Sequence, residues 1–153
     1  KEEIYTQILI SANIERHKEI ENFTKQDRSA SELLLSFALD YVNFFLDNNE
    51  LFRILMTFML QSENMNLTEE QNTQLIHTTN ENVLAISEIL QKGVASGEFV
   101  SGIDFNQMRN AIWGMLNGII SLYIYTGSPE KRAERIRTTV RDNLSIFIKG
   151  IKA

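Results

Sequence analysis

The sequence contains few side chains that could carry catalytic chemistry. Its 153 residues include no cysteine and only two histidines, His17 and His77, so disulfides, thiolate zinc sites and cysteine nucleophiles are excluded. His17 lies in a run of charged residues, and His77 lies among polar residues, as is typical of solvated histidines. No HExxH, GxSxG or phosphate-binding glycine loop occurs. Because catalysis needs such groups to converge, we expect no enzymatic activity, no metal and no cofactor.

The charge of the chain also restricts its partners. The formal net charge is −5, which argues against nonspecific binding to nucleic acid or to an anionic membrane, since both attract positive charge. The segment from Pro129 to Ala153 is basic, with seven Lys or Arg and three acids. No aromatic residues alternate with its basic residues as a base-stacking surface would require, so we interpret this segment as a solvated outer face.

Helix-capping patterns divide the chain. Ser29-Ala-Ser-Glu32 and Thr68-Glu-Glu-Gln71 have the form of capping boxes, Asp104 is a further N-cap candidate, and Ser128 precedes a proline suited to a first helical turn. Alternating strand patterns are absent. We therefore predict an all-α domain over residues 1–153, with six helices at about 1–23, 30–47, 49–62, 69–96, 104–127 and 129–150. The opening KEEIYTQILI has no signal-peptide core, so we expect a cytoplasmic protein.

Two of these segments are apolar on nearly every side. Residues 30–47 have one narrow polar strip, from Glu32 to Asp47, and residues 49–62 repeat the design. Such helices need neighbours on most faces. We expect the segment 30–47 to run through the middle of the domain.

The stretch AIWGMLNGIISLYIYTG, residues 111–127, belongs to a run of 20 residues without charge. As a helix, the run would be about 30 Å long, enough to cross a bilayer. Its polar residues, Asn117 and Ser121 among them, and the apolar helices around it argue against a membrane span. Ala111, Gly114, Gly118 and Ser121 would instead form a line of small side chains that lets another helix approach closely.

This pattern suggests pairing of two copies. One flank of 104–127 can pack within the domain, while the other flank and the apolar stripe of the last helix face a second chain in an isologous homodimer. Which flank faces which way is left open. The residues that we expect at the dimer interface are Gly114, Gly118, Met115, Leu122, Ile136, Val140, Leu144 and Phe147.

Several short motifs, taken in order, resemble the C-terminal ligand-binding and dimerisation domain of the tetracycline-repressor (TetR) family of transcriptional regulators. They are Lys1-Glu-Glu-Ile-Tyr5, Asn49-Glu-Leu-Phe-Arg53, Gly93-x-x-x-Gly97-Glu-Phe99 followed by Asp104, and Ala111-x-x-Gly114-x-x-x-Gly118. The resemblance covers essentially the whole chain. The three helices that form the DNA reader in this family are missing, so DNA binding is expected only through an N-terminal domain outside these residues.

The resemblance implies a six-helix regulatory domain of a transcriptional repressor. Its last two helices would form a four-helix bundle in a homodimer, and an internal pocket would lie among residues 1–96 and the inner flank of 104–127. Ligand binding would tilt the first helix and change the separation of the two DNA readers. Because half-sites repeat every ~34 to 36 Å, a small shift would break the match to the operator.

For the pocket we predict mainly large apolar residues with a few polar ones. Each could instead be plain core packing, and the buried amide of Asn117 could make a purely structural hydrogen bond. Methionines suit a pocket that changes shape. An apolar pocket with few polar groups favours a hydrophobic or amphipathic small molecule. The candidates are Phe37, Tyr41, Phe44, Met56, Met59, Leu60, Asn80, Val83, Trp113 and Asn117.

Two other classes of function remain open. A helical interaction module would bind a partner protein through the last two helices. A small lipid carrier would share the apolar cavity but would have no DNA reader upstream.

Overall fold

The computed structural model describes residues 1–153 as six α-helices and one 3-10 turn. They are α1 (Glu2–Thr24), α2 (Ala30–Asp47), α3 (Asn49–Gln61), η1 (Ser62–Asn64), α4 (Glu69–Ala95), α5 (Phe105–Tyr123) and α6 (Pro129–Ile151). The all-α prediction is confirmed. The predicted boundaries agree to within one residue except at the end of α5, which we expected at residue 127.

The early end of α5 has a local cause. The hydroxyl of Thr126 donates to the carbonyl of Tyr123 at 3.0 Å, and the backbone N–H of Thr126 bonds the same oxygen. Gly127 then takes a positive φ of 69°, a conformation that glycine adopts without steric penalty. The chain therefore turns here and reaches the cap of α6 at Ser128, which accepts from Lys131 N.

The predicted caps are present, with one difference. Thr68 and Gln71 form a full reciprocal capping box at the start of α4, and Asp104 accepts from two backbone amides of α5. Ser29 accepts from the amide of Glu32, but the Glu32 carboxylate lies 3.7 Å from Arg28 instead of returning to Ser29. The box at α2 is therefore only half formed.

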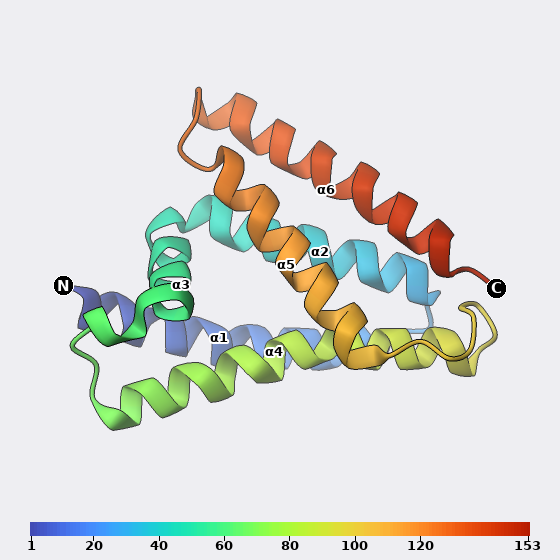
Figure 1. Ribbon diagram of the computed structural model, residues 1–153, viewed down its shortest axis with the longest axis horizontal. Helices are drawn as coiled ribbons and strands as arrows, with labels where there is room; N and C mark the ends of the chain where they lie inside the picture. The colour runs from blue at the N-terminus through green and yellow to red at the C-terminus, as the bar shows by residue number, and fades with distance from the viewer.

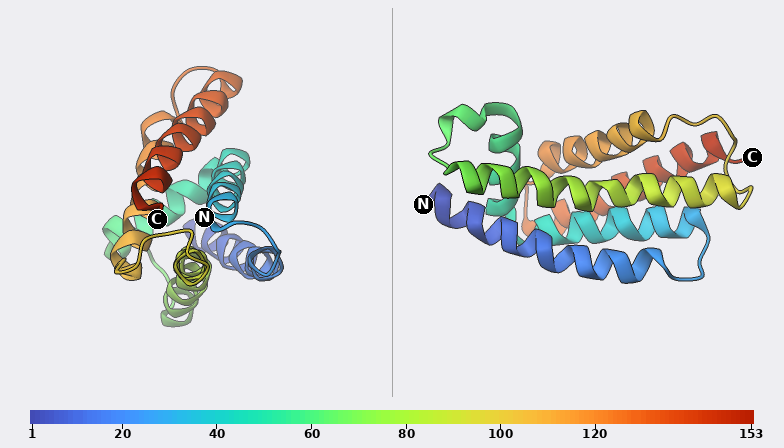
Figure 2. Two further views of the ribbon diagram at one scale, coloured as in Figure 1. Left: turned by 90° about the vertical axis from the view of Figure 1, so that its right-hand side faces the viewer. Right: turned by 90° about the horizontal axis from the view of Figure 1, so that it is seen from below.

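The long helices α1 and α4 lie side by side and run in the same direction, with α2 running the opposite way beside them (Figure 1; Figure 2). Helix α3 crosses the end of the molecule near the N-terminus, and α5 and α6 form a pair above α4 and α2. Helix α2 contacts all five other α-helices. Its predicted central position is confirmed.

Helix α3 is covered by its neighbours on fewer faces than its apolar composition predicts. Leu51, Phe52, Ile54 and Leu55 are buried, but Met59 is 45% exposed and Leu60 is 79% exposed. The apolar residues of the last turn of α3 are therefore exposed in this chain. No helix of this chain combines the length and apolar character that crossing a bilayer requires.

The C-terminus is fastened to the loop between α4 and α5. Val100 N donates to Ile151 O at 2.8 Å, and Ala153 N donates to Glu98 O at 3.0 Å. The side chain of Phe99 is buried in the same loop against Gly93, where a Cβ would overlap the ring. The Glu98 carboxylate accepts from the backbone and hydroxyl of Ser31, so the start of α2 is tied to this junction as well.

Candidate ligand-binding site

Five helices converge on a small internal cavity whose lining is mainly apolar with a few polar groups. Its volume is about 10 Å³, which is room for roughly one water molecule. Its walls are polar on the side of α1 and α4 and apolar elsewhere. The lining residues are Asn13, Arg16, Tyr41, Phe45, Leu55, Thr79, Asn82, Val83 and Trp113.

The Tyr41 hydroxyl is the hydrogen-bonding centre of this region. It accepts from Trp113 Nε1 at 3.0 Å and donates to Asn117 Oδ1. Burial raises the pKa of the Tyr41 phenol far above its ordinary value, because the charged phenolate would be poorly solvated there. Tyr41 therefore remains a neutral donor. The amide nitrogen of Asn117 is buried and has no hydrogen-bond partner.

Arg16 of α1 is the one charged residue in the buried set, with 8% of its surface exposed. Its guanidinium carbon lies 4.5 Å from the centroid of the Phe44 ring and 5.6 Å from that of Tyr41. The nearest carboxylate oxygen, Asp40 Oδ2, is 3.9 Å from Nη2, and neither Nη2 nor Nε makes a hydrogen bond. Burial lowers the pKa of Arg16, although nearby Asp40 opposes this; arginine stays protonated in proteins.

Helices α1 and α4 meet along a polar seam. Asn13 Nδ2 donates to Thr78 Oγ1 at 3.2 Å and to Thr79 Oγ1 at 3.3 Å, and Asn82 Nδ2 donates to the carbonyl of Asn13. Asn82 Oδ1 and, farther along α1, Thr6 Oγ1 are buried without a partner. Partly satisfied buried polar groups contribute less to stability than either apolar packing or a complete network. The unpaired groups therefore make the α1–α4 contact less stable than a fully paired seam would be.

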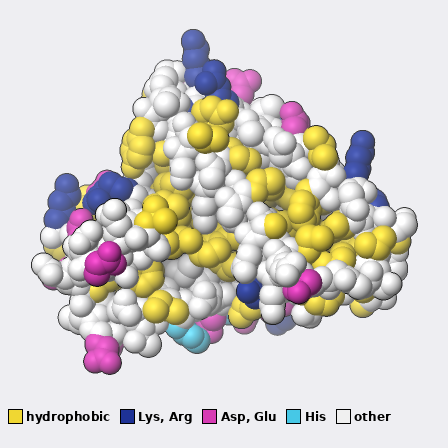
Figure 3. All heavy atoms as spheres, viewed as in Figure 1, with side chains coloured by type: hydrophobic (Ala, Val, Ile, Leu, Met, Phe, Trp, Pro, Cys, Tyr) yellow, Lys and Arg dark blue, Asp and Glu magenta, His cyan; other side chains and the backbone are white.

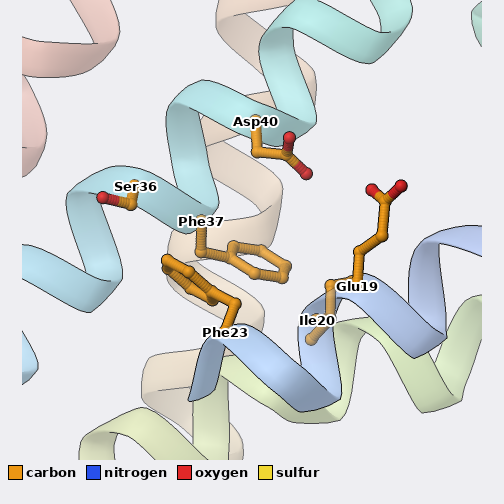
Figure 4. A pocket seen from close by; sticks show the side chains of 6 residues that line it. All are labelled: Glu19, Ile20, Phe23, Ser36, Phe37 and Asp40. Atoms are coloured by element: carbon orange, nitrogen blue, oxygen red, sulfur yellow. The ribbon is translucent and has the colours of Figure 1, made fainter. Parts of the chain in front are cut away.

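Of the larger hollows that open to the surface, two contain predicted pocket residues. A cleft of about 230 Å³ lies between α1 and α2, where the rings of Phe23 and Phe37 lie on one side and the carboxylates of Glu19 and Asp40 on the other (Figure 4). A second cleft, of about 290 Å³, lies between α3 and the end of α5. Its lining residues are Phe52, Arg53, Met56, Thr57, Leu60, Gln61, Ser121, Ile124 and Tyr125.

The structure places most, but not all, of the predicted pocket residues in or beside these three hollows. Tyr41, Val83 and Trp113 line the internal cavity, and Asn117 bonds to Tyr41. Phe44 packs against the guanidinium of Arg16, whereas Phe37 lines the α1–α2 cleft.

The remaining candidates lie away from the internal cavity. Met56 and Leu60 line the α3–α5 cleft. Met59 and Asn80 face solvent.

Our sequence reasoning missed Arg16, Asn13 and Asn82. Arg16 stands in the run Glu15-Arg-His-Lys-Glu19, which is typical of a solvated surface. Its spacing from Leu9, Asn13 and Ile20 does indicate burial, because these four positions share one face of a helix.

The predicted dimer residues also divide into groups. Gly114, Gly118 and Leu122 are exposed on α5, and Met115 is half-buried. On α6, Phe147 is half-buried, while Ile136, Val140 and Leu144 are fully covered within the chain. A partner could not reach these three without repacking the core.

Exposed apolar residues also occur on both α5 and α6. Ile146 of α6, which we did not predict, is 68% exposed, and Leu122 is 67% exposed. Figure 3 shows the face of the molecule on which α5 lies. Hydrophobic side chains extend across the middle of this face, and charged side chains lie mainly near its edge.

Residues 27–144 match the family model described as the tetracyclin repressor-like C-terminal domain. A solved structure of a transcriptional regulator, FadR from Bacillus subtilis, in complex with stearoyl-CoA, has a similar fold, with a TM-score of 0.72 and 15% sequence identity. The alignment covers 98% of this chain and 76% of that chain. No curated protein matches the sequence.

Proposed function

The chain belongs to the tetracyclin repressor-like C-terminal domain family, and on this premise we propose that it senses a hydrophobic or amphipathic effector for a TetR-like transcriptional repressor. The family is one of transcription regulators rather than enzymes. We propose that residues 1–153 act as a single cytoplasmic ligand-binding and dimerisation domain. DNA would be bound through a separate N-terminal domain.

The observation that carries this proposal is the mainly apolar cavity, with a few polar groups, where five helices meet. Apolar walls with a few fixed polar groups are typical of sites for amphipathic small molecules. The solved regulator of similar fold was crystallised with stearoyl-CoA, which is such a molecule. This supports the ligand class for the present chain without identifying the ligand.

The small size of the cavity bears on the mechanism. About 10 Å³ is far below the roughly 300 Å³ of a typical ligand site, so a ligand can enter only if helices move apart. Ligand binding would then favour a wider arrangement over the closed one, and that difference in affinity is what shifts a conformational equilibrium.

Helix α1 is the element that we expect to move. It contacts α4 along the partly satisfied polar seam. Near its N-terminus it is held by two long polar contacts, from Arg53 to Glu2 at 3.8 Å and from Gln71 to the carbonyl of Glu3 at 3.4 Å. In a homodimer, moving α1 would alter the distance between the two DNA-binding domains and thereby the fit to half-sites.

The dimer proposal is supported by α5. A Cβ added to Gly114 or Gly118 would meet no atom within 4 Å in this chain, so nothing within the protomer requires glycine there. Glycine inside a helix costs roughly 0.5–1 kcal/mol relative to alanine. Close approach of a partner helix at these exposed positions would account for both glycines.

Trp113 provides a direct test, because it is the only tryptophan and lines the cavity. We expect 1-decanol, as a neutral amphipathic probe, to change the tryptophan emission and raise the melting temperature. Val83→Phe, which fills the cavity, should weaken this binding by about tenfold. Leu84→Phe, at the adjacent exposed position, should not. Absence of binding, or equal binding by both variants, would contradict the proposed site.

A further inference from the structure

The guanidinium of Arg16 is not satisfied by its own chain. It lines the internal cavity, is 8% exposed, and leaves Nε and Nη2 without hydrogen-bond partners. Buried charges in proteins are ordinarily paired and hydrogen-bonded. For comparison, the surface residue Arg53 donates to Glu50 at 2.6 Å.

From this geometry we propose that Arg16 binds the carboxylate of an amphipathic effector, with the apolar part of the effector among Phe45, Leu55, Val83 and Trp113. The inference rests on the proposed effector-sensing function and adds the chemical class of the ligand. It also makes Arg16 the residue that distinguishes carboxylates from other amphipathic ligands.

A carboxylate suits this position in shape. The planar guanidinium presents its N–H groups as a fork that matches the two oxygens of a carboxylate. The guanidinium carbon lies over the Phe44 and Tyr41 rings, while Nε and Nη2, which share one edge of the guanidinium, have no hydrogen-bond partner. Two donors on one edge can bind both oxygens of one carboxylate.

The charge of the site favours a single negative charge. Arg16 is the only Lys, Arg or His among the residues that line the cavity. A carboxylate would be neutralised by this one cation. A doubly charged phosphate ester would bring an uncompensated charge into a buried site, which is costly.

Asp40 is the group that the ligand would displace. It lies 3.9 Å from Arg16 Nη2, and its side chain is 60% exposed, so it can return to water at the α1–α2 cleft that it lines. Since Arg16 belongs to α1 and Asp40 to α2, exchanging one carboxylate for the other would release a contact between these helices. Recognition of the head group and movement of α1 would then be the same event.

The test compares three probes that share a ten-carbon chain: decanoate, 1-decanol and decyl phosphate. Binding is followed by Trp113 fluorescence and by calorimetry at pH 7 and fixed ionic strength. In the wild-type chain, we expect decanoate to bind more tightly than either other probe. Arg16→Gln should weaken decanoate by about tenfold or more and change 1-decanol binding less than about twofold.

Two further variants complete the test. Asp40→Asn removes the competing carboxylate and should strengthen decanoate binding several-fold, without a matching change for 1-decanol. Lys18→Gln removes an exposed positive charge from the same helix and should change neither probe. If Arg16→Gln does not fold, the opposite change expected of Asp40→Asn still decides the result.

The outcomes separate the two proposals. If 1-decanol binds but Arg16→Gln and Asp40→Asn leave the decanoate-to-decanol affinity ratio unchanged, the role of Arg16 is refuted while the effector site stands. Tighter binding of decyl phosphate than of decanoate would refute the choice of a carboxylate. If none of the three probes binds the wild-type chain, both proposals fail.

Discussion

The indole N–H of Trp113 donates to the hydroxyl of Tyr41 across 3.0 Å, and the same hydroxyl donates to the amide oxygen of Asn117. One phenol on α2 therefore joins two residues that lie one turn apart on α5. Both helices border the internal cavity, so this junction fixes one of its walls.

Removing the Tyr41 hydroxyl should destabilise the fold. In Tyr41→Phe, Trp113 Nε1 and Asn117 Oδ1 lose their partner in a buried setting, and an unsatisfied buried group costs about 1–3 kcal/mol. Urea unfolding followed by circular dichroism measures the change. Tyr125→Phe is the control, because Tyr125 is 61% exposed; equal stability of the two variants would show that the junction contributes little.

The free energy of unfolding should fall at alkaline pH because the phenol of Tyr41 ionises more readily in the unfolded chain than in the folded protein. The phenol ionises near pH 10.0 in the unfolded chain, whereas burial raises its pKa in the folded protein. Tyr41 therefore contributes its full stabilisation below pH 10, and this contribution declines as pH rises above 10, by up to about 1.4 kcal/mol per pH unit.

Tyr41→Phe lacks this contribution, which provides the control. The difference in unfolding free energy between wild type and Tyr41→Phe should narrow between pH 9 and pH 11. A difference that stays constant over this range would count against a protonated, buried Tyr41.

Gly93 should not tolerate a side chain. The Phe99 ring occupies the space that a Cβ would need, so Gly93→Ala must displace a buried aromatic residue at the C-terminal junction. Overpacking of this kind costs about 1–3 kcal/mol, more than the helix gains from alanine. Gly150→Ala is the matched control, because its Cβ would meet no atom within 4 Å. Thermal unfolding should show a lowered midpoint for Gly93→Ala only.

A large side chain at Gly118 should weaken dimerisation more than it changes the folding of the protomer. Gly118→Ala should stabilise the isolated protomer slightly, since alanine is the better helix former by about 0.8–1 kcal/mol. Gly118→Leu should weaken the proposed dimer by about tenfold or more, because its side chain would separate the paired helices.

Sedimentation equilibrium measures the dissociation constant. Ala95→Leu, which adds a bulky apolar side chain at an exposed position of α4, is the control. Unchanged dimerisation of Gly118→Leu would place the interface elsewhere.

The fold could be predicted from sequence largely because its helices carry their own start signals. Caps such as Thr68 and Asp104 act locally, so their effect is visible without knowledge of the tertiary structure. The end of α5 was harder to predict. There the turn depends on Thr126 and Gly127 together, within a stretch that otherwise has helical composition.

The candidate site could be predicted only in part. A polar Asn117 in an apolar helix signals a buried hydrogen bond, and the structure gives it Tyr41 as partner. The burial of Arg16 depends instead on how α1 packs against α2 and α4, which its charged neighbours in sequence conceal. Likewise, the apolar stripe of Ile136, Val140 and Leu144 fits a partner chain as well as its own core, and only the tertiary packing distinguishes the two.

The backbone bonds between the C-terminus and the α4–α5 loop limit which parts of the domain can respond to a ligand. The turn at Gly127 closes one end of the α5–α6 pair, and the bonds from Val100 to Ile151 and from Ala153 to Glu98 close the other. Held at both ends, the pair has little freedom to hinge open. A ligand that enters beside Trp113 is therefore expected to displace α1 along its partly paired polar seam rather than to separate α5 from α6.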